Sequence, residues 1–208
     1  MTPNMHFATP SKVLHWLMAV MVLAMLLIGV GMVTSFSERY HLLVGIHKPL
    51  GIAILILVIV RFINRMVNRP PPLPATLPPI LKLAAEASHI LLYALLFVMP
   101  VIGWAMLSAS PYPIVLFGGV HLPPILPQNA LLYSWLRPAH TYLAYLLFFT
   151  FLAHLGAALM HALIFRDGVF ESMASWGPGN TKPPLTQSNQ PSFDAGLATT
   201  GAEVTPGE

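Results

Sequence analysis

The sequence predicts an all-α integral membrane protein, a bundle of four transmembrane helices followed by a disordered C-terminal tail. Of its 208 residues, 56% are hydrophobic and only 8% are charged. So few polar side chains cannot cover the surface of a soluble domain of this length. In addition, several apolar stretches reach the roughly 20 residues that a helix needs to cross a bilayer. Composition and hydrophobic run length therefore both indicate a membrane protein.

The predicted helices are residues 13–33, 43–63, 83–107 and 140–165. None of them carries Lys or Arg in its middle third, where a charge is most costly. The first stretch is longer than the core of a signal peptide, so we expect it to be retained as a helix. We place the four-helix domain at residues 1–176. The region 177–208 is rich in Pro, Gly, Ser and Thr, which predicts a disordered cytoplasmic tail.

The loop charges predict the orientation. An even number of helices places both chain ends on one side of the membrane, and basic residues are enriched in cytoplasmic loops. One side carries Lys12, Arg61, Arg65, Arg69, Lys82, Arg166 and Lys182, and the other carries Arg39, Lys48 and Arg137. We therefore expect both termini in the cytoplasm.

The absence of cysteine limits which metal sites and cofactors the chain can hold. A chain without cysteine forms no disulfide, no iron–sulfur site and no covalent c-type haem attachment. Histidine is then the principal candidate ligand. Those that fall within or at the ends of the predicted helices are His15, His47, His89, His140, His154 and His161. Because ionisable groups inside a membrane are costly, we expect a functional role for this set.

The last helix predicts two sites. Fourteen residues separate His140 from His154, so on a helix their side chains lie about 40° apart in azimuth and about 21 Å apart along the axis. One helix face thus offers imidazoles at two depths, as two stacked b-type haems require. Matching depths predict the pairs His47–His140 on the outer side and His15–His154 on the inner side, each pair ligating a haem iron.

Two further histidines leave alternatives open. His161 lies seven residues beyond His154 and only about 20° away in azimuth, so spacing alone does not decide which of them binds the inner haem. His89 follows Glu86 by three residues, which puts both on one helix face, where they are candidates to bind or deprotonate a quinol. A polar pair at the membrane interface is the simpler interpretation of His89 and Glu86.

Basic residues on the outer side form a third candidate feature. Lys48 and Arg137 lie close in sequence to His47 and His140. Their charges are suited to neutralise haem propionates or to attract a small anion. The alternative is that both side chains only extend toward the lipid headgroups.

With these residues in place, the chain resembles bacterial cytochrome b561 over residues 8–174. The resemblance rests on the order and spacing of "LHWLMA", "IHKPLGI", "VIVRFINR", "SHILLYALLFVMPVIGWAM" and "HTYLAYLLFFTFLAHLGAALMHALIFRDG". It implies a four-helix protein of the bacterial inner membrane that holds two b-type haems and exchanges electrons with ubiquinone. In one branch of that family the electron donor is superoxide.

The resemblance also bears on the inner ligand. The fourteen-residue spacing is similar to that of cytochrome b subunits of membrane formate dehydrogenases, where both positions bind haem. This favours His154 over His161 as the ligand, and it implies that His161 lies at a cytoplasmic quinone site.

The function we expect is electron transfer between ubiquinone and a periplasmic one-electron partner, with superoxide as one candidate. Two alternatives remain at this point. The first is a cytochrome b membrane-anchor subunit of a dehydrogenase or hydrogenase. The second is a membrane transporter or assembly factor without a redox cofactor.

Overall fold

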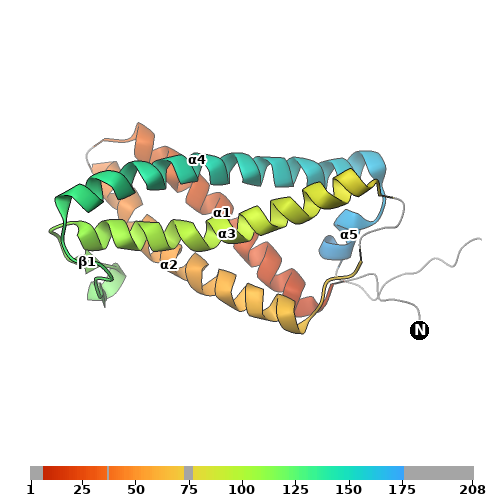
Figure 1. The fold of residues 1–208 in the computed structure, drawn as a ribbon, viewed down its shortest axis with the longest axis horizontal. Coiled ribbons are helices and arrows are strands. Elements are labelled where there is room, and N and C mark those ends of the chain that lie inside the picture. Colours follow the sequence, from red (N-terminus) through yellow and green to blue (C-terminus); the bar gives the residue numbers. More distant parts are fainter. Residues whose placement is uncertain (1–6, 37, 73–76, 176–208) are drawn as a thin grey trace, which may run out of the picture. The chain divides into compact units, whose positions relative to one another are not determined.

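The predicted membrane bundle of four helices is confirmed by the computed structural model, which describes residues 7–36, 38–72 and 77–175 (Figure 1). The predicted tail at 177–208 lies outside these residues. The long helices are α1 (Thr9–Thr34), α2 (Glu38–Val67), α3 (Pro79–Ala109) and α4 (Ala130–Met160), the last continued by the π-helical turn η2 (His161–Phe165). Each is long and apolar enough to cross a membrane.

The helix bounds extend beyond the predicted apolar stretches, most of all in α4. This helix begins at Ala130, ten residues before the predicted start at position 140. The side chain of Asn129 caps it by accepting a hydrogen bond from the backbone N–H of Leu132 (3.0 Å). Pro138 lies inside the helix, as membrane helices tolerate. Consequently His140 lies well within α4 and not at its first residue.

The connection between α3 and α4 folds into a small antiparallel hairpin. The strands are β1 (Ile114–Val115) and β2 (His121–Leu122), joined by the 3₁₀ turn η1 (Phe117–Gly119). Within that turn Gly118 has a φ of 68°, which favours glycine. The indole of Trp104 donates a hydrogen bond to the Pro123 carbonyl (2.9 Å), so the connection is fastened to the end of α3. We refer to this end of the bundle as the hairpin end.

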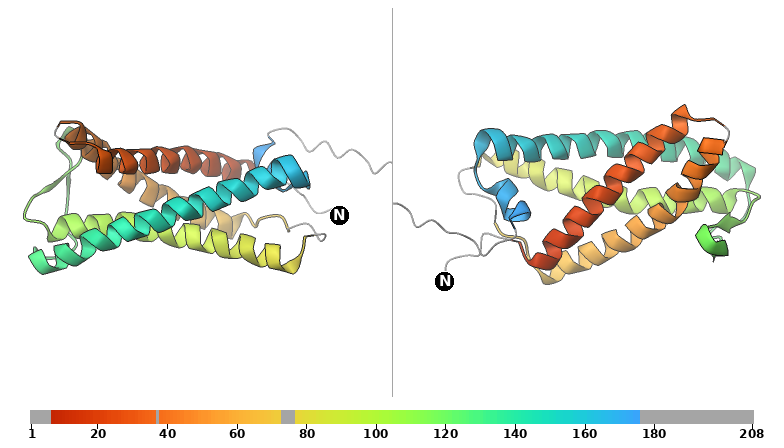
Figure 2. Two further views of the ribbon diagram at one scale, coloured as in Figure 1. Left: turned by 90° about the horizontal axis from the view of Figure 1, so that it is seen from above. Right: turned by 180° about the vertical axis from the view of Figure 1, so that it is seen from behind.

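The helices pack as two antiparallel pairs. α1 packs along α2, α3 packs along α4, and α2 also contacts α3 (Figures 1 and 2). α4 makes its extensive contacts with α3 and few with α1 or α2. The buried cluster between α3 and α4 consists of Leu95, Met99 and Leu147. The α1–α2 pair and the α3–α4 pair are therefore held together by contacts outside this cluster, among them those between α2 and α3.

The opposite end of the bundle holds the short helix α5 (Val169–Ala174), and we call it the α5 end. Here α5 is hydrogen-bonded to the beginning of α1. The backbone N–H of Phe7 donates to Ser172 (3.3 Å), Lys12 Nζ donates to the carbonyl of Ser175 (2.7 Å), and the indole of Trp16 donates to that of Met173 (3.2 Å). The first and last described residues thus lie on the same side of the bundle.

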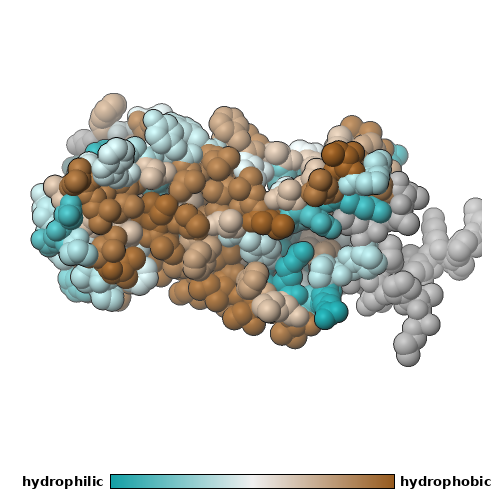
Figure 3. All heavy atoms as spheres, in the orientation of Figure 1, coloured by the Kyte–Doolittle hydropathy of each residue, from teal (hydrophilic) through white to brown (hydrophobic). Residues whose placement is uncertain are grey.

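The outer surface matches a lipid environment. Many large apolar side chains are exposed along all four long helices. On the face shown in Figure 3, hydrophobic residues cover the middle of the bundle and polar residues gather toward its ends. Four helices of suitable length with an apolar surface make this a membrane protein.

Replacing Leu147 by Ala should lower the free energy of unfolding by about 2 kcal/mol, because it leaves a cavity between α3 and α4. Leu147 is only 5% exposed, whereas its neighbour Leu146 is 44% exposed and serves as the control. The measurement is thermal unfolding of both Ala variants in detergent. Equal melting temperatures for the two variants would contradict this description of the core.

Candidate functional site

The structure brings four of the predicted histidines together in two pairs. The rings of His47 on α2 and His140 on α4 have their centroids 6.3 Å apart, with 70° between the ring planes. The rings of His15 on α1 and His154 on α4 are also 6.3 Å apart, with 77° between the planes. Both pairs join α4 to a helix with which it otherwise makes few contacts.

The two pairs lie at different depths. His140 and His154 belong to one continuous helix, and their fourteen-residue spacing corresponds to about 21 Å along its axis. His47 lies toward the hairpin end, and His15 lies near the beginning of α1 at the α5 end. The arrangement is therefore two separate two-histidine sites, stacked along the bundle.

The geometry of each pair fits a metal held between two imidazoles. Metal–nitrogen bonds of about 2 Å on each side, plus about 1 Å from nitrogen to ring centre, give a centroid separation of about 6 Å. Among the described residues, Nδ1 of His47 and Nδ1 of His140 are buried without a hydrogen-bond partner. These residues fit the axial ligation of a b-type haem iron, which needs two imidazoles and no cysteine.

Gly103 on α3 allows His140 to occupy its position. A Cβ atom at Gly103 would meet Cε1 of His140 at 3.2 Å and Nδ1 at 3.6 Å. The first distance is tighter than ordinary van der Waals contact, so a larger residue would push the imidazole away. Glycine thus lets the backbone of α3 approach the ring directly.

His89 lies beside the pair at the α5 end. Its ring centroid is 5.3 Å from that of His154, closer than the 6.3 Å between His15 and His154. A separation of 5.3 Å is short for two rings on opposite sides of one metal. Glu86, three residues before His89, is exposed, and no hydrogen bond joins these two described side chains. His89 is directed instead toward α4.

His161 has a carboxylate partner that the sequence did not indicate. Its Nδ1 lies 2.7 Å from Oδ2 of Asp167, and Oδ1 of Asp167 accepts a hydrogen bond from the backbone N–H of Val169 (3.2 Å). The chain reverses here because Arg166 and Gly168 adopt left-handed conformations, with φ of 49° and 82°. One carboxylate therefore orients the His161 ring and also binds the start of α5.

The two basic residues predicted near the hairpin-end pair occupy different environments. Lys48 is half-buried and Arg137 is exposed. Neither side chain makes a hydrogen bond or ion pair to another residue in the described part of the chain. Both remain available to an anion at this end of the bundle.

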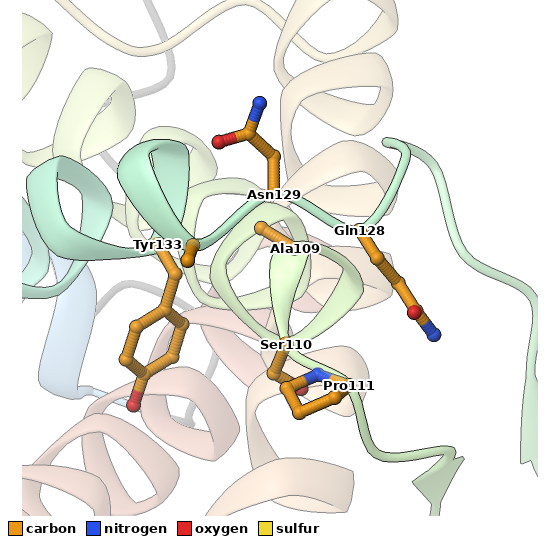
Figure 4. Close-up of a pocket in the computed structure, with 7 residues that line it drawn as sticks. Ala109, Ser110, Pro111, Gln128, Asn129 and Tyr133 are labelled. Atoms are coloured by element: carbon orange, nitrogen blue, oxygen red, sulfur yellow. The ribbon is translucent and has the colours of Figure 1, made fainter.

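A surface pocket at the hairpin end is separate from the histidine pairs. Its lining, drawn in Figure 4, comes from the end of α3 and the start of α4, namely Ala109, Ser110, Pro111, Gln128, Asn129, Ala130 and Tyr133. It includes no histidine, and the amide oxygen of Asn129 already caps α4. The pocket therefore offers no chemistry of its own.

Comparison with known proteins agrees with this geometry. A family model described as prokaryotic cytochrome b561 matches residues 6–176. The chain is 32% identical over 174 residues to "Cytochrome b561 homolog 2" of Escherichia coli (strain K12), which covers 83% of this chain and 92% of the relative. It is 28% identical over 128 residues to "Probable superoxide oxidase CybB" of Yersinia pestis, which covers 62% of this chain and 72% of the relative.

Four apolar helices, paired histidines in their interior and these relatives define a membrane-embedded b-type cytochrome. The chain belongs to the prokaryotic cytochrome b561 family. The predicted family, haem binding and role in electron transport are thereby confirmed. The alternative of a transporter or assembly factor without a redox cofactor has no support.

Replacing Gly103 by Ala should displace His140 and weaken haem binding at the hairpin end, because the new methyl group meets the ring at 3.2 Å. A Cβ atom at Gly156 would meet nothing within 4 Å, so Gly156→Ala is the matched control. The measurement is haem content together with the reduced-minus-oxidised spectrum. Wild-type content and an unaltered spectrum in Gly103→Ala would contradict the proposed contact.

Proposed function

We propose that this protein transfers electrons between ubiquinone and a periplasmic one-electron partner through two b-type haems. The observation that carries the proposal is the presence of two histidine pairs, each 6.3 Å apart, at two levels of one bundle. The bound haems supply one-electron redox chemistry. The chain supplies axial imidazoles, an apolar surrounding and groups that handle protons and anions.

In this proposal His47 and His140 hold the haem at the hairpin end, and His15 and His154 hold the haem at the α5 end. The assignment of His154 is supported by its position opposite His15, whereas the ring of His161 is bound to Asp167. The ring separation also favours His15 over His89 as the partner of His154, since 5.3 Å is short for trans ligation. His89 then lies beside this haem.

We further propose that the α5 end faces the cytoplasm of a bacterium and the hairpin end the periplasm. Both ends of the described chain lie at the α5 end, as do Lys12, Arg61, Arg65 and Lys82. An excess of basic residues marks the cytoplasmic side of an inner-membrane protein.

The quinone site in this proposal lies at the α5 end around His161. With Nδ1 directed at Asp167, Nε2 of His161 is left to donate a proton to a quinone oxygen or to accept one from a quinol hydroxyl. The contact with Asp167 fixes the orientation of the ring in either case. His89, with its ring toward α4, is a second candidate for proton exchange.

Superoxide is the periplasmic partner we favour, because one relative is described as a probable superoxide oxidase. Two superoxide anions, one quinone and two protons would yield two dioxygen molecules and one quinol. Lys48 and Arg137 lie at the hairpin end and would attract the anion through their positive charge. Such attraction weakens as the salt concentration rises.

His47→Ala and His154→Ala should each lose one haem of two, because each removes one axial ligand from a different site. The measurement is haem per chain in purified wild type and variants. Two haems retained in both variants would overturn the ligand assignment. A larger subunit that co-purifies in stoichiometric amount would instead assign the chain as a membrane anchor of another enzyme.

His161→Gln should retain both haems but form ubiquinol about 100-fold more slowly when superoxide is supplied with ubiquinone, because proton transfer is lost. His41→Gln, an exposed histidine on α2, is the matched control and should react at the wild-type rate. The measurement is ubiquinol formation alongside the haem spectrum. An undiminished rate in His161→Gln would exclude this ring, and wild-type protein that forms no ubiquinol would exclude superoxide as the donor.

A further inference from the structure

A polar cluster at the α5 end has no part in the function described above. It consists of Ser11 on α1, Arg61, Asn64 and Arg65 on α2, and Tyr93 on α3, which line one small pocket. Three separate helices contribute to it. Only 8% of the residues are charged, yet two arginines line this one pocket. Their positive charge needs a compensating partner.

The guanidinium of Arg61 is held in place by neighbours on two other helices. Its Nε donates a hydrogen bond to the hydroxyl of Tyr93 (3.1 Å), and one Nη donates to the backbone carbonyl of Ser11 (3.5 Å). These bonds use two of the five N–H donors of the side chain. The remaining donors have no bond to another described residue, so Arg61 is oriented with binding capacity to spare.

The other members support the same surface. The hydroxyl of Ser11 accepts a hydrogen bond from Asn64 (2.7 Å), which leaves its own proton to be donated. The guanidinium carbon of Arg65 lies 6.0 Å from the ring centre of Tyr93, a cation–π distance. Tyr93 thereby contacts both arginines. The cluster therefore directs hydrogen-bond donors and positive charge toward one pocket.

The positive charge of this cluster has no carboxylate partner in the described part of the chain. The one ion pair found there joins His161 to Asp167 and involves neither arginine. Arginines at the edge of an apolar bundle are costly without a counter-charge. The expected ligand is therefore an anion, and a carboxylate suits the planar fork of a guanidinium best.

The position of the cluster indicates which molecule supplies the carboxylate that Arg61 binds. Ser11 lies one helical turn before His15, and Tyr93 lies one turn after His89, so each shares a helix face with a histidine of the α5-end site. Arg61 donates hydrogen bonds to the Tyr93 hydroxyl and to the Ser11 carbonyl, so its guanidinium lies one helical turn from a histidine on each of two helices. An anion bound by Arg61 would lie next to the histidine pair.

We propose that Arg61, supported by Tyr93 and Ser11 and assisted by Arg65, binds the propionate carboxylates of the haem held by His15 and His154. This inference rests on the proposed function. A haem without covalent attachment is retained by its axial ligands and its carboxylates, and its two negative charges need compensation at this depth. A lipid phosphate shares the anionic chemistry, but the hydrogen bonds of Arg61 to residues one turn from His15 and His89 favour the haem.

A positive charge beside a haem stabilises its reduced form, because reduction adds an electron. Arg61→Gln should therefore lower the midpoint potential of the α5-end haem and leave the other haem unchanged. Arg61→Lys keeps the charge and should restore most of the potential. Arg69→Gln, an exposed arginine two turns further along the chain and outside the pocket, is the matched control and should behave as wild type.

The second readout is infrared spectroscopy of the purified holoprotein carrying haem labelled with ¹³C at the propionate carboxyls. The reduced-minus-oxidised spectrum should show labelled carboxylate bands that shift in Arg61→Gln and remain in place in Arg69→Gln. If Arg61→Gln does not fold, Tyr93→Phe, which removes the acceptor for Arg61, should cause a smaller shift of the same bands.

Unchanged bands and an unchanged potential in Arg61→Gln, with two haems per chain, would overturn the inference. So would the loss of a co-purifying phospholipid from Arg61→Gln without any change in the carboxylate bands, since the site would then belong to a lipid headgroup. Wild-type protein without haem would instead overturn the proposed function.

Discussion

The structure depends on imidazole rings that meet in pairs between helices in an apolar interior. A histidine buried in a membrane bundle is costly unless its ring nitrogens have partners. Here the rings of His47 and His140, and those of His15 and His154, are directed at each other across the bundle at 6.3 Å. In the proposed function, an iron held by both members of a pair would give each ring a partner and would link helices that otherwise make few contacts.

Several other features follow from that constraint. α4 carries one histidine of each pair, so it must be long, continuous and rotated so that one face serves both depths. Gly103 must be small, because the backbone of α3 approaches His140 closely. At the α5 end, His161 lies two helical turns beyond His154 and contacts Asp167 where the chain reverses into α5. The cluster around Arg61 places positive charge near the His15–His154 pair.

Much of this arrangement could be predicted from sequence because a membrane helix has a fixed rise and azimuth per residue. The spacing of His140 and His154 determines one face and two depths, and the position of His15 and His47 near opposite ends of the bundle selects their partners. The start of α4 could not be predicted in this way, because the predicted apolar stretch begins only at position 140 and Pro138 lies inside the helix, as membrane helices tolerate.

Features that depend on tertiary rotation or irregular backbone also escaped prediction. The approach of His89 to His154 depends on the rotation of α3, which local spacing does not give. The contact of Asp167 with His161 requires the π-helical turn and the left-handed residues Arg166 and Gly168. Arg61 was recognised only as a loop charge, because its partners Ser11 and Tyr93 come from two other helices.

The most direct test of the central claim is electron paramagnetic resonance of the oxidised protein, with spins counted per chain. Imidazole planes crossed at 70° and 77° should give strongly anisotropic low-spin ferric signals from two haems. Two such spins per chain are the result we predict. A high-spin signal, a rhombic signal from parallel imidazoles, or fewer than two ferric haems per chain would contradict the account.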